Sequence, residues 1–256
     1  MWQAKPGAMS DLSLIAAVVL VFLVAGTVKG VAGIGLPAVV MGLATLFLDA
    51  RLAIALLLVP MLVSNIWQIW RTGGIPGALR RYWLFALVMM ITIYGTALIA
   101  AAAPEALILG VVGVAFVLFA LANLVLKPPP LPDLWDRPAQ VTGGFAAGVL
   151  GGLTAIWSPP IAIYLSARQV DRDEFVRGTG LLFTLAAVPL LAGYWRAGLF
   201  TGTQATLSMA MVVPTLAGFA VGEAIRRRIP SDRFRLLLNW VFLALGANLI
   251  RRALFG

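Results

Sequence analysis

The sequence contains no cysteine and no histidine. Without cysteine the chain can form no disulfide, no thiolate nucleophile and no cysteine-ligated metal site. Without histidine it lacks the side chain that most often serves as a general base and as a metal ligand. Because no pair of carboxylates stands within an apolar run either, we expect no catalytic residue, no metal site and no cofactor, and we expect that the protein is not an enzyme.

Charged residues are also scarce. They make up 11% of the chain, against 61% hydrophobic residues, whereas soluble proteins are about a quarter charged. The mean hydropathy is +0.99, and apolar runs of nearly 20 residues recur from one end to the other, as in transmembrane helices. The composition predicts an all-α, polytopic membrane protein. A cleaved signal peptide over residues 12–29 is a weaker interpretation, since no clear A-x-A site follows that run.

The net charge of +9 has two interpretations. A basic chain can bind nucleic acid, but here the lysines and arginines collect in loops beside apolar runs, where they set orientation and meet anionic lipid. We therefore expect the lipid bilayer as a partner and no nucleic acid.

Two glycine- and proline-rich stretches interrupt the apolar runs. The first is Gly26 to Pro37, G-T-V-K-G-V-A-G-I-G-L-P, and the second is Gly148 to Pro160, G-V-L-G-G-L-T-A-I-W-S-P-P. Aligning Pro37 with Pro159 also pairs Gly26 with Gly148, Gly30 with Gly152, Ile34 with Ile156 and Asp49 with Asp171. The chain therefore resembles a duplicated unit with a broken helix in each copy.

Each copy is predicted to contain a broken, re-entrant-like helix hairpin and three transmembrane helices. In the first repeat, residues 1–126, the hairpin halves are residues 12–29 and 37–48, and the spans are residues 52–70, 82–102 and 105–126. In the second repeat, residues 139–256, the halves are residues 139–152 and 159–167, and the spans are residues 175–195, 202–225 and 234–250. The half at 37–48 covers only about 18 Å, less than a hydrocarbon core of about 30 Å, so we expect it to begin near mid-membrane. The proline-rich segment 127–138 is the linker between the repeats.

The orientation of the chain in the membrane follows from the number of spans in each repeat and from the distribution of basic residues. A hairpin returns the chain to its starting side and three spans carry it across, so the second repeat starts on the opposite side. One side then receives thirteen of the 19 basic residues, and the positive-inside rule makes that side, with the linker, cytoplasmic. Both termini are expected outside. The result is a pair of inverted-topology repeats, the architecture of many secondary transporters.

The two helix breaks are predicted to form the binding site. Lipid cannot satisfy free backbone groups, so broken helices persist only where protein packs them or a cavity accepts them. Glycine allows unusual backbone angles and proline opens a helix well, and Ser158 is a candidate N-cap. A half-helix N-terminus offers free N–H groups and a positive dipole end, which suits a small anion. The backbone positions predicted to contribute are Gly30, Gly33, Gly35, Pro37 and Pro159.

Lys29 is the most informative single residue in the first break. A charge in a spanning segment costs about 2.5–3.5 kcal/mol by insertion scales and usually has a role. One hypothesis is that Lys29 is the counter-charge of a bound anion; the other is that it extends to a helix end or packs against a loop carbonyl. Its partner in the repeat alignment is Gly151, so the site would be asymmetric.

Other polar side chains near the breaks are candidates for substrate binding. Thr154, Trp157 and Ser158 offer two hydroxyls and an indole N–H, donors that suit oxyanion oxygens, although Ser and Thr also form ordinary interhelical hydrogen bonds in membranes. Asn65 and Gln68 are three residues apart, share a helix face and are predicted to line the same cavity.

These motifs resemble the sulfite exporter TauE/SafE family. The glycine-rich hairpin ending in proline and repeated after about 120 residues carries the resemblance, together with the runs F-T-L-A-A-V-P-L-L-A-G-Y-W-R-A-G-L-F, V-V-P-T-L-A-G-F-A-V-G-E-A-I-R-R-R-I-P and L-L-L-N-W-V-F-L-A-L-G-A-N-L-I. It covers roughly residues 12–252. The resemblance implies a bacterial inner-membrane transporter of small anions such as sulfite, sulfonates or related organosulfur compounds. The usual G-x-G-G-G is reduced here to G-I-G-L-P, and the second copy has A-I-W-S-P-P; these departures favour an atypical or organic anion.

The sequence thus predicts a secondary transporter of a small anion that works by alternating access. No nucleotide-binding motif is present, so the energy would come from the membrane potential or from a coupling ion such as H⁺ or Na⁺. A passive anion channel on the same scaffold is the first alternative, and an intramembrane enzyme and a structural membrane subunit are others. The scaffold is also compatible with a homo-oligomer.

Overall fold

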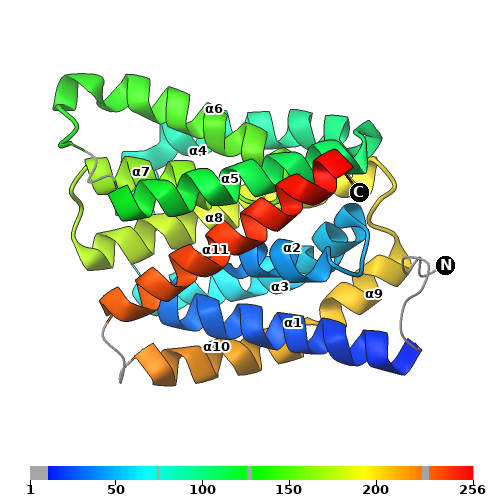
Figure 1. Cartoon of the computed structure of the whole chain (residues 1–256). Helices are drawn as coiled ribbons and strands as arrows, with labels where there is room; N and C mark the ends of the chain where they lie inside the picture. The colour runs from blue at the N-terminus through cyan, green and yellow to red at the C-terminus, as the bar shows by residue number, and fades with distance from the viewer. Residues whose placement is uncertain (1–10, 74, 126–128, 227–230, 256) are drawn as a thin grey trace.

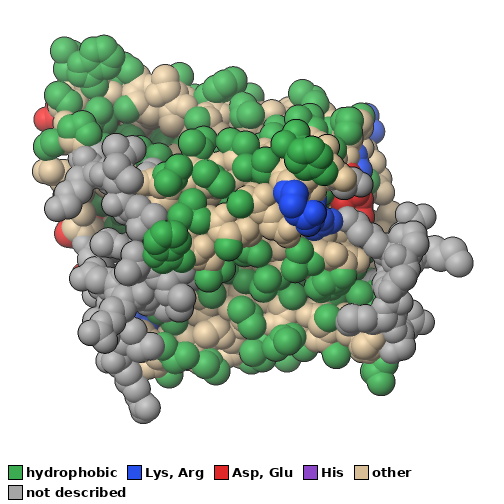
Figure 2. Space-filling view, viewed as in Figure 1, with side chains coloured by type: hydrophobic (Ala, Val, Ile, Leu, Met, Phe, Trp, Pro, Cys, Tyr) green, Lys and Arg blue, Asp and Glu red, His purple; other side chains and the backbone are tan. Residues whose placement is uncertain are grey.

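A computed structural model describes residues 11–73, 75–125, 129–226 and 231–255. Of these residues 87% are helical, and none of them forms a β-strand. Five segments are long and apolar enough to cross a membrane: Leu12–Ala32, Ala50–Trp70, Ile75–Ala102, Asp173–Arg196 and Gly202–Arg226. Figure 2 shows hydrophobic side chains spread over the viewed face, with one basic cluster near the C-terminal end of α11 and the other charged side chains toward the edges. The all-α, multi-pass membrane class is confirmed.

The helices follow the chain as shown in Figure 1. The first half contains α1 (Asp11–Ala32), α2 (Leu36–Ala44), α3 (Ala50–Thr72), α4 (Ile75–Ala102) and α5 (Glu105–Val125). The second half contains the short 3₁₀ turn η1 (Asp133–Trp135), α6 (Asp136–Thr154), α7 (Ser158–Ala167), α8 (Arg172–Arg196), α9 (Gly202–Ala210), α10 (Val212–Arg226) and α11 (Ser231–Phe255). The start of α1 and the end of α11 lie at the same end of the bundle, while α6 and α8 start at the other.

The two halves interlock through four helix pairs. The first helix of each half lies along a helix late in the other half, α1 along α10 and α6 along α4. The pairs α5–α11 and α3–α8 join equivalent helices of the two halves. The short helix α2 packs on α1, α3 and α11, and α7 packs on α6 and α8.

Glycines explain how closely the outer pairs approach. A Cβ on Gly26 would lie 2.2 Å from the carbonyl oxygen of Thr215, and one on Gly30 would lie 2.2 Å from that of Phe219. On α6, a Cβ on Gly152 would lie 1.8 Å from Thr96 Oγ1 on α4. Small residues at such spacing let two backbones touch and are typical of helix association in membranes.

Asp49 and Asp171, which the sequence alignment pairs, have the same structural role. The side chain of Asp49 accepts from the backbone N–H of Arg51 at 2.8 Å, at the start of α3. That of Asp171 accepts from the N–H of Glu174 at 2.8 Å, at the start of α8. Both are N-caps that satisfy otherwise free amides.

Proline leaves a defect in α3 that a neighbouring helix repairs. Pro60 has no N–H, so the carbonyl of Leu56 loses its partner within the helix. Ser208 on α9 donates its hydroxyl to that carbonyl at 2.8 Å and accepts from the N–H of Val59 at 3.1 Å. Such re-satisfaction by a neighbour is what permits proline in a membrane helix.

A network of ion pairs and hydrogen bonds stabilises the end of the bundle where α6 and α8 start. The guanidinium of Arg168, after α7, lies 2.8 Å from Asp133 and 3.3 Å from Asp136. Tyr164 donates to Asp136 at 2.8 Å. The hydrogen bond to Asp133 raises the pKa of Arg168. This network holds the α6–α7 hairpin to the segment before it.

One predicted span is confirmed and two predictions of element bounds need correction. The span 202–225 coincides with the apolar segment Gly202–Arg226, in which Met211 alone separates α9 from α10, because Pro214 cannot donate to the carbonyl four residues before it. The span predicted to begin at residue 82 begins at Ile75. The predicted first hairpin half, residues 12–29, is a helix of 22 residues, which at 1.5 Å per residue is about 33 Å long, so only the second half is short.

Candidate functional site

Lys29 lies in the last turn of α1 and is 2% exposed. Its Nζ donates to Ser64 Oγ at 2.9 Å and to Asn65 Oδ1, both on α3. An ammonium has three donors, so one N–H remains for another ligand. No acidic side chain in the described part of the chain forms an ion pair with Lys29. The hypothesis in which Lys29 extends to a helix end or a loop carbonyl does not match this geometry.

Asn65 has a second donor, its amide nitrogen, next to the oxygen that Lys29 contacts. An ammonium cannot accept a hydrogen bond, so the amide must present its oxygen to Lys29. The amide nitrogen of Asn65 is buried, and the described residues provide no hydrogen-bond partner for it. The Ser64 hydroxyl, in contrast, also donates to the Met61 carbonyl at 3.1 Å. Lys29 and Asn65 therefore form a buried donor pair around one positive charge.

Gln68 extends this cluster from α3 to α8. It lies one turn beyond Asn65 and is buried, and its Nε2 donates to the backbone carbonyl of Val176 at 3.2 Å. Lys29, Asn65 and Gln68 thus connect three helices that are far apart in the sequence.

The first break follows Lys29 directly. The N–H of Gly33 donates to the Lys29 carbonyl at 2.7 Å, which ends α1. Gly33 and Gly35 have φ angles of 78° and 103°, which favour glycine, and Gly35 is the N-cap of α2. Pro37 stands in the first turn of α2, where its missing N–H costs nothing. Gly30 has a different place, since it packs against α10 rather than in the break.

The second break uses a side chain where the first uses glycine. Ala155 has φ 60°, a conformation that costs a non-glycine residue roughly 1–2 kcal/mol. Thr154 compensates: its hydroxyl donates to the Leu150 carbonyl at 2.6 Å and accepts from the Ile156 N–H at 3.2 Å. Because its only hydroxyl proton is used in this way, Thr154 serves the turn.

Trp157 and Ser158 lie at the start of α7. The Trp157 ring is 1% exposed and packs edge-on against Phe183 of α8, with 6.2 Å between ring centroids. Its Nε1 is buried and has no hydrogen-bond partner in the described part of the chain. Ser158 is the first residue of α7 and Trp157 its N-cap without a side-chain hydrogen bond, so the prediction of Ser158 as N-cap is wrong. Pro159 and the proline after it remove two amides from this helix start.

The structure brings some of the predicted residues together and not others. Gln68 contacts α8 at Val176, and Trp157 contacts it at Phe183, seven residues or about 10 Å further along. Both therefore contact α8. The half-helices α2 and α7 are not among the pairs that pack extensively. The expected meeting of their two N-termini stays a prediction.

Ser64 is the contributor that sequence reasoning missed. It is fully buried and accepts from Lys29. The signal was present, since Ser64 and Asn65 form a polar pair inside an apolar span, and Gln68 continues the same face.

Comparisons with known proteins identify one matching family. A family model described as "Sulfite exporter TauE/SafE" matches residues 18–249, nearly the whole chain. A search of curated proteins and a search of solved structures each return no significant match.

Proposed function

Because this chain belongs to the sulfite exporter TauE/SafE family, we propose that it is a secondary transporter that carries a small anion across the bacterial inner membrane. The substrate class is sulfite, a sulfonate or a related organosulfur or organic anion. The first repeat, residues 1–126, and the second, residues 139–256, move against each other around the site, with residues 127–138 as the cytoplasmic linker.

A buried lysine without a carboxylate partner in the described residues is the observation that carries the proposal. Lys29 is held by two neutral side chains and by no carboxylate of the described residues. Buried charges are normally paired, and a charge at this depth costs about 2.5–3.5 kcal/mol. A bound anion would supply the missing charge, and the remaining N–H of Lys29 and the amide of Asn65 would donate to its oxygens.

The repeat alignment gives this polar cluster to only one of the two halves, which suits one bound anion per chain. Under the repeat alignment, Lys29, Ser64, Asn65 and Gln68 correspond to Gly151, Ala186, Ala187 and Leu190. These counterparts are buried and carry no polar side-chain atom. A duplicated scaffold with one polar cluster therefore offers a single place for charge, while the second break contributes the indole of Trp157.

The helix pairing supports an inverted-repeat arrangement. Exchanging the two halves turns the pair α1–α10 into α6–α4, and leaves α5–α11 and α3–α8 unchanged. Equivalent aspartates cap α3 and α8. In such architectures transport proceeds by rocking of one repeat against the other around a fixed site. The proposal places both termini outside and the loop after α10 in the cytoplasm.

A passive anion channel on this scaffold is the second candidate, and flux measurements separate the two. In proteoliposomes containing the purified protein, we expect saturable uptake of ³⁵S-sulfite or of methanesulfonate, accelerated by the same anion inside. An imposed H⁺ or Na⁺ gradient should drive accumulation. Linear uptake without acceleration would favour the channel, and uptake no faster than that of empty liposomes for every anion tried would reject the proposal. Arg80→Ala, a change at an exposed arginine, is the control for altered surface charge.

A further inference from the structure

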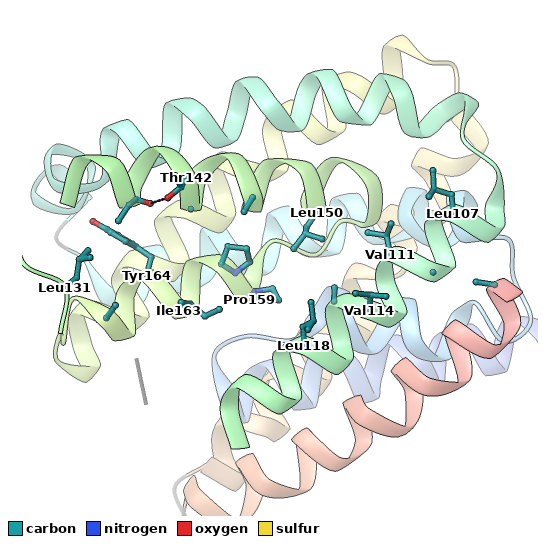
Figure 3. Close-up of a pocket in the computed structure, with 18 of the residues that line it drawn as sticks. Leu107, Val111, Val114, Leu118, Leu131, Thr142, Leu150, Pro159, Ile163 and Tyr164 are labelled. Carbon is teal, nitrogen blue, oxygen red and sulfur yellow. Dashed lines mark hydrogen bonds between the residues drawn. The ribbon is translucent and has the colours of Figure 1, made fainter. Parts of the chain in front are cut away.

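A long apolar groove runs between α5, α6, α7 and α11, away from the Lys29 cluster. It encloses about 940 Å³, a size in the range of lipophilic ligand sites. Figure 3 shows Leu107, Val111, Val114 and Leu118 along α5, facing Leu150, Pro159 and Ile163 across the groove. The only hydroxyls among its lining side chains are those of Thr142 and Tyr164. Such a lining is suited to hydrocarbon and to no polar solute.

The groove has the length and exposure of a lipid-facing site. Its lining on α5 runs from Ala106 to Leu118, about 18 Å at 1.5 Å per residue, while one leaflet of hydrocarbon is about 15 Å thick. Leu118 and Val114 are 62% and 47% exposed, so the groove opens to the surroundings of the helices. In a multi-pass membrane protein these surroundings are the bilayer.

The two ends of the groove differ in charge. At one end, the lining residues Ala253 and Leu254 directly follow Arg251 and Arg252, and Figure 2 shows basic side chains over the C-terminal end of α11 within an apolar face. The Nη1 of Arg252 is buried, and the described residues provide no hydrogen-bond partner for it. One carboxylate, that of Glu105, directly precedes the lining residue Ala106 at the same end. With two arginines and one glutamate, this end of the groove has a net positive charge next to hydrocarbon.

The opposite end offers no comparable attraction for an anion. There the lining reaches Leu131 and Tyr164, and Tyr164 is bonded to the carboxylate of Asp136. The nearby cation, Arg168, is already paired with Asp133 and Asp136.

We propose that the groove binds one acyl chain of an anionic phospholipid, with the phosphate placed at Arg251 and Arg252. The charge of the two ends fixes the direction of the lipid, and the continuous apolar wall accommodates its chain. Pro159 and Pro160 line the groove, so the chain lies against the first turn of α7, next to the second helix break. Lipid at this site stabilises the packing of α7 seen in the structure. The inference holds whether or not the protein carries an anion.

Titration of the purified, delipidated protein with phosphatidylglycerol, followed by native mass spectrometry, tests the proposal. We expect one lipid to be retained in preference to phosphatidylcholine. Arg251→Gln with Arg252→Gln should weaken phosphatidylglycerol binding, about fivefold for each arginine by the usual strength of a basic residue at an anionic surface. Arg196→Gln, at an exposed arginine in the last turn of α8, should have no such effect.

Filling the groove separates this site from the general lipid annulus. Val114→Trp should reduce the retained lipid, whereas Val188→Trp, at a position of α8 that is also about half exposed at 49%, should not. Equal retention in the two variants, or equal affinity for phosphatidylglycerol and phosphatidylcholine, would overturn the proposal. A dimer that Val114→Trp dissociates without loss of lipid would also overturn it, because the groove would then be a contact between two copies.

Discussion

Lys29 on α1 donates to the side-chain oxygen of Asn65 on α3, and this one bond fixes the direction of the whole Asn65 amide. The oxygen faces the ammonium, so the nitrogen, buried and without a partner in the described residues, stays beside it. A positive charge and a neutral donor thereby share one buried space. In our proposal, a bound anion satisfies both.

Asn65→Asp should remove anion binding without loss of folding. The new carboxylate would have nearly the shape of the amide and would pair with Lys29, supplying the counter-charge that we assign to the substrate. We expect no anion-dependent stabilisation in this variant, and a melting temperature without anion equal to or above that of the wild type. Asn248→Asp, at a residue bonded to Arg251 instead, is the matched control and should bind anion normally. Unchanged anion affinity in Asn65→Asp would remove Asn65 from the site.

Trp157→Phe tests the indole donor of the second break. Phenylalanine keeps a ring against Phe183 but has no N–H. A hydrogen bond to a charged group is worth about 1.5–3 kcal/mol, so loss of this donor should weaken anion affinity roughly tenfold or more. Affinity is measured by titration calorimetry in detergent. If Trp157→Phe lowers the melting temperature while affinity stays the same, the residue serves packing alone.

Gly30→Ala should destabilise the fold. The added Cβ would lie 2.2 Å from the Phe219 carbonyl oxygen, and overpacking of this kind costs about 1–3 kcal/mol. Gly95→Ala on α4 is the control, because its Cβ would have no atom within 4 Å and alanine favours the helix. Unfolding in a denaturant series measures both. Equal stability of the two variants would contradict the close α1–α10 contact.

Ser208→Ala should also cost stability, for a different reason. It leaves the Leu56 carbonyl, freed by Pro60, without the donor that Ser208 provides, and interhelical hydrogen bonds in membranes are worth roughly 1 kcal/mol. Ser166→Ala, at an exposed position, should be neutral in the same unfolding assay. A loss as small as that of the control would mean that the carbonyl finds another partner.

Local chemistry made part of this structure predictable. Lys29 is conspicuous because a charge is rare in an apolar run, and the breaks at Gly33 to Gly35 and at Ala155 follow from glycine and proline in spans. The pairing of Asp49 with Asp171 follows from sequence spacing alone. The charge and the breaks depend on residues close together in the chain, and the aspartate pairing depends on the repeat alignment.

What depends on contacts between distant helices was not predictable. Gly30 belongs to the α1–α10 contact rather than to the break, and only the position of Phe219 shows this. Ser64 is a hydrogen-bond partner of Lys29 because the lysine side chain reaches from α1 to α3. Thr154, in contrast, is occupied by a local contact within its own turn.

The most direct test of the account is the anion-dependent thermal stability of the wild type and of Lys29→Met, with Arg80→Met as a surface control. Sulfite, methanesulfonate, sulfate and short carboxylates are compared at equal ionic strength. At about 100 times its dissociation constant, a substrate should add roughly 2.7 kcal/mol to the stability of the wild type and of the control. We predict that Lys29→Met folds and shows no such gain. The same gain in Lys29→Met, or no gain with any anion in the wild type, would contradict the assignment of Lys29 as the counter-charge of the transported anion.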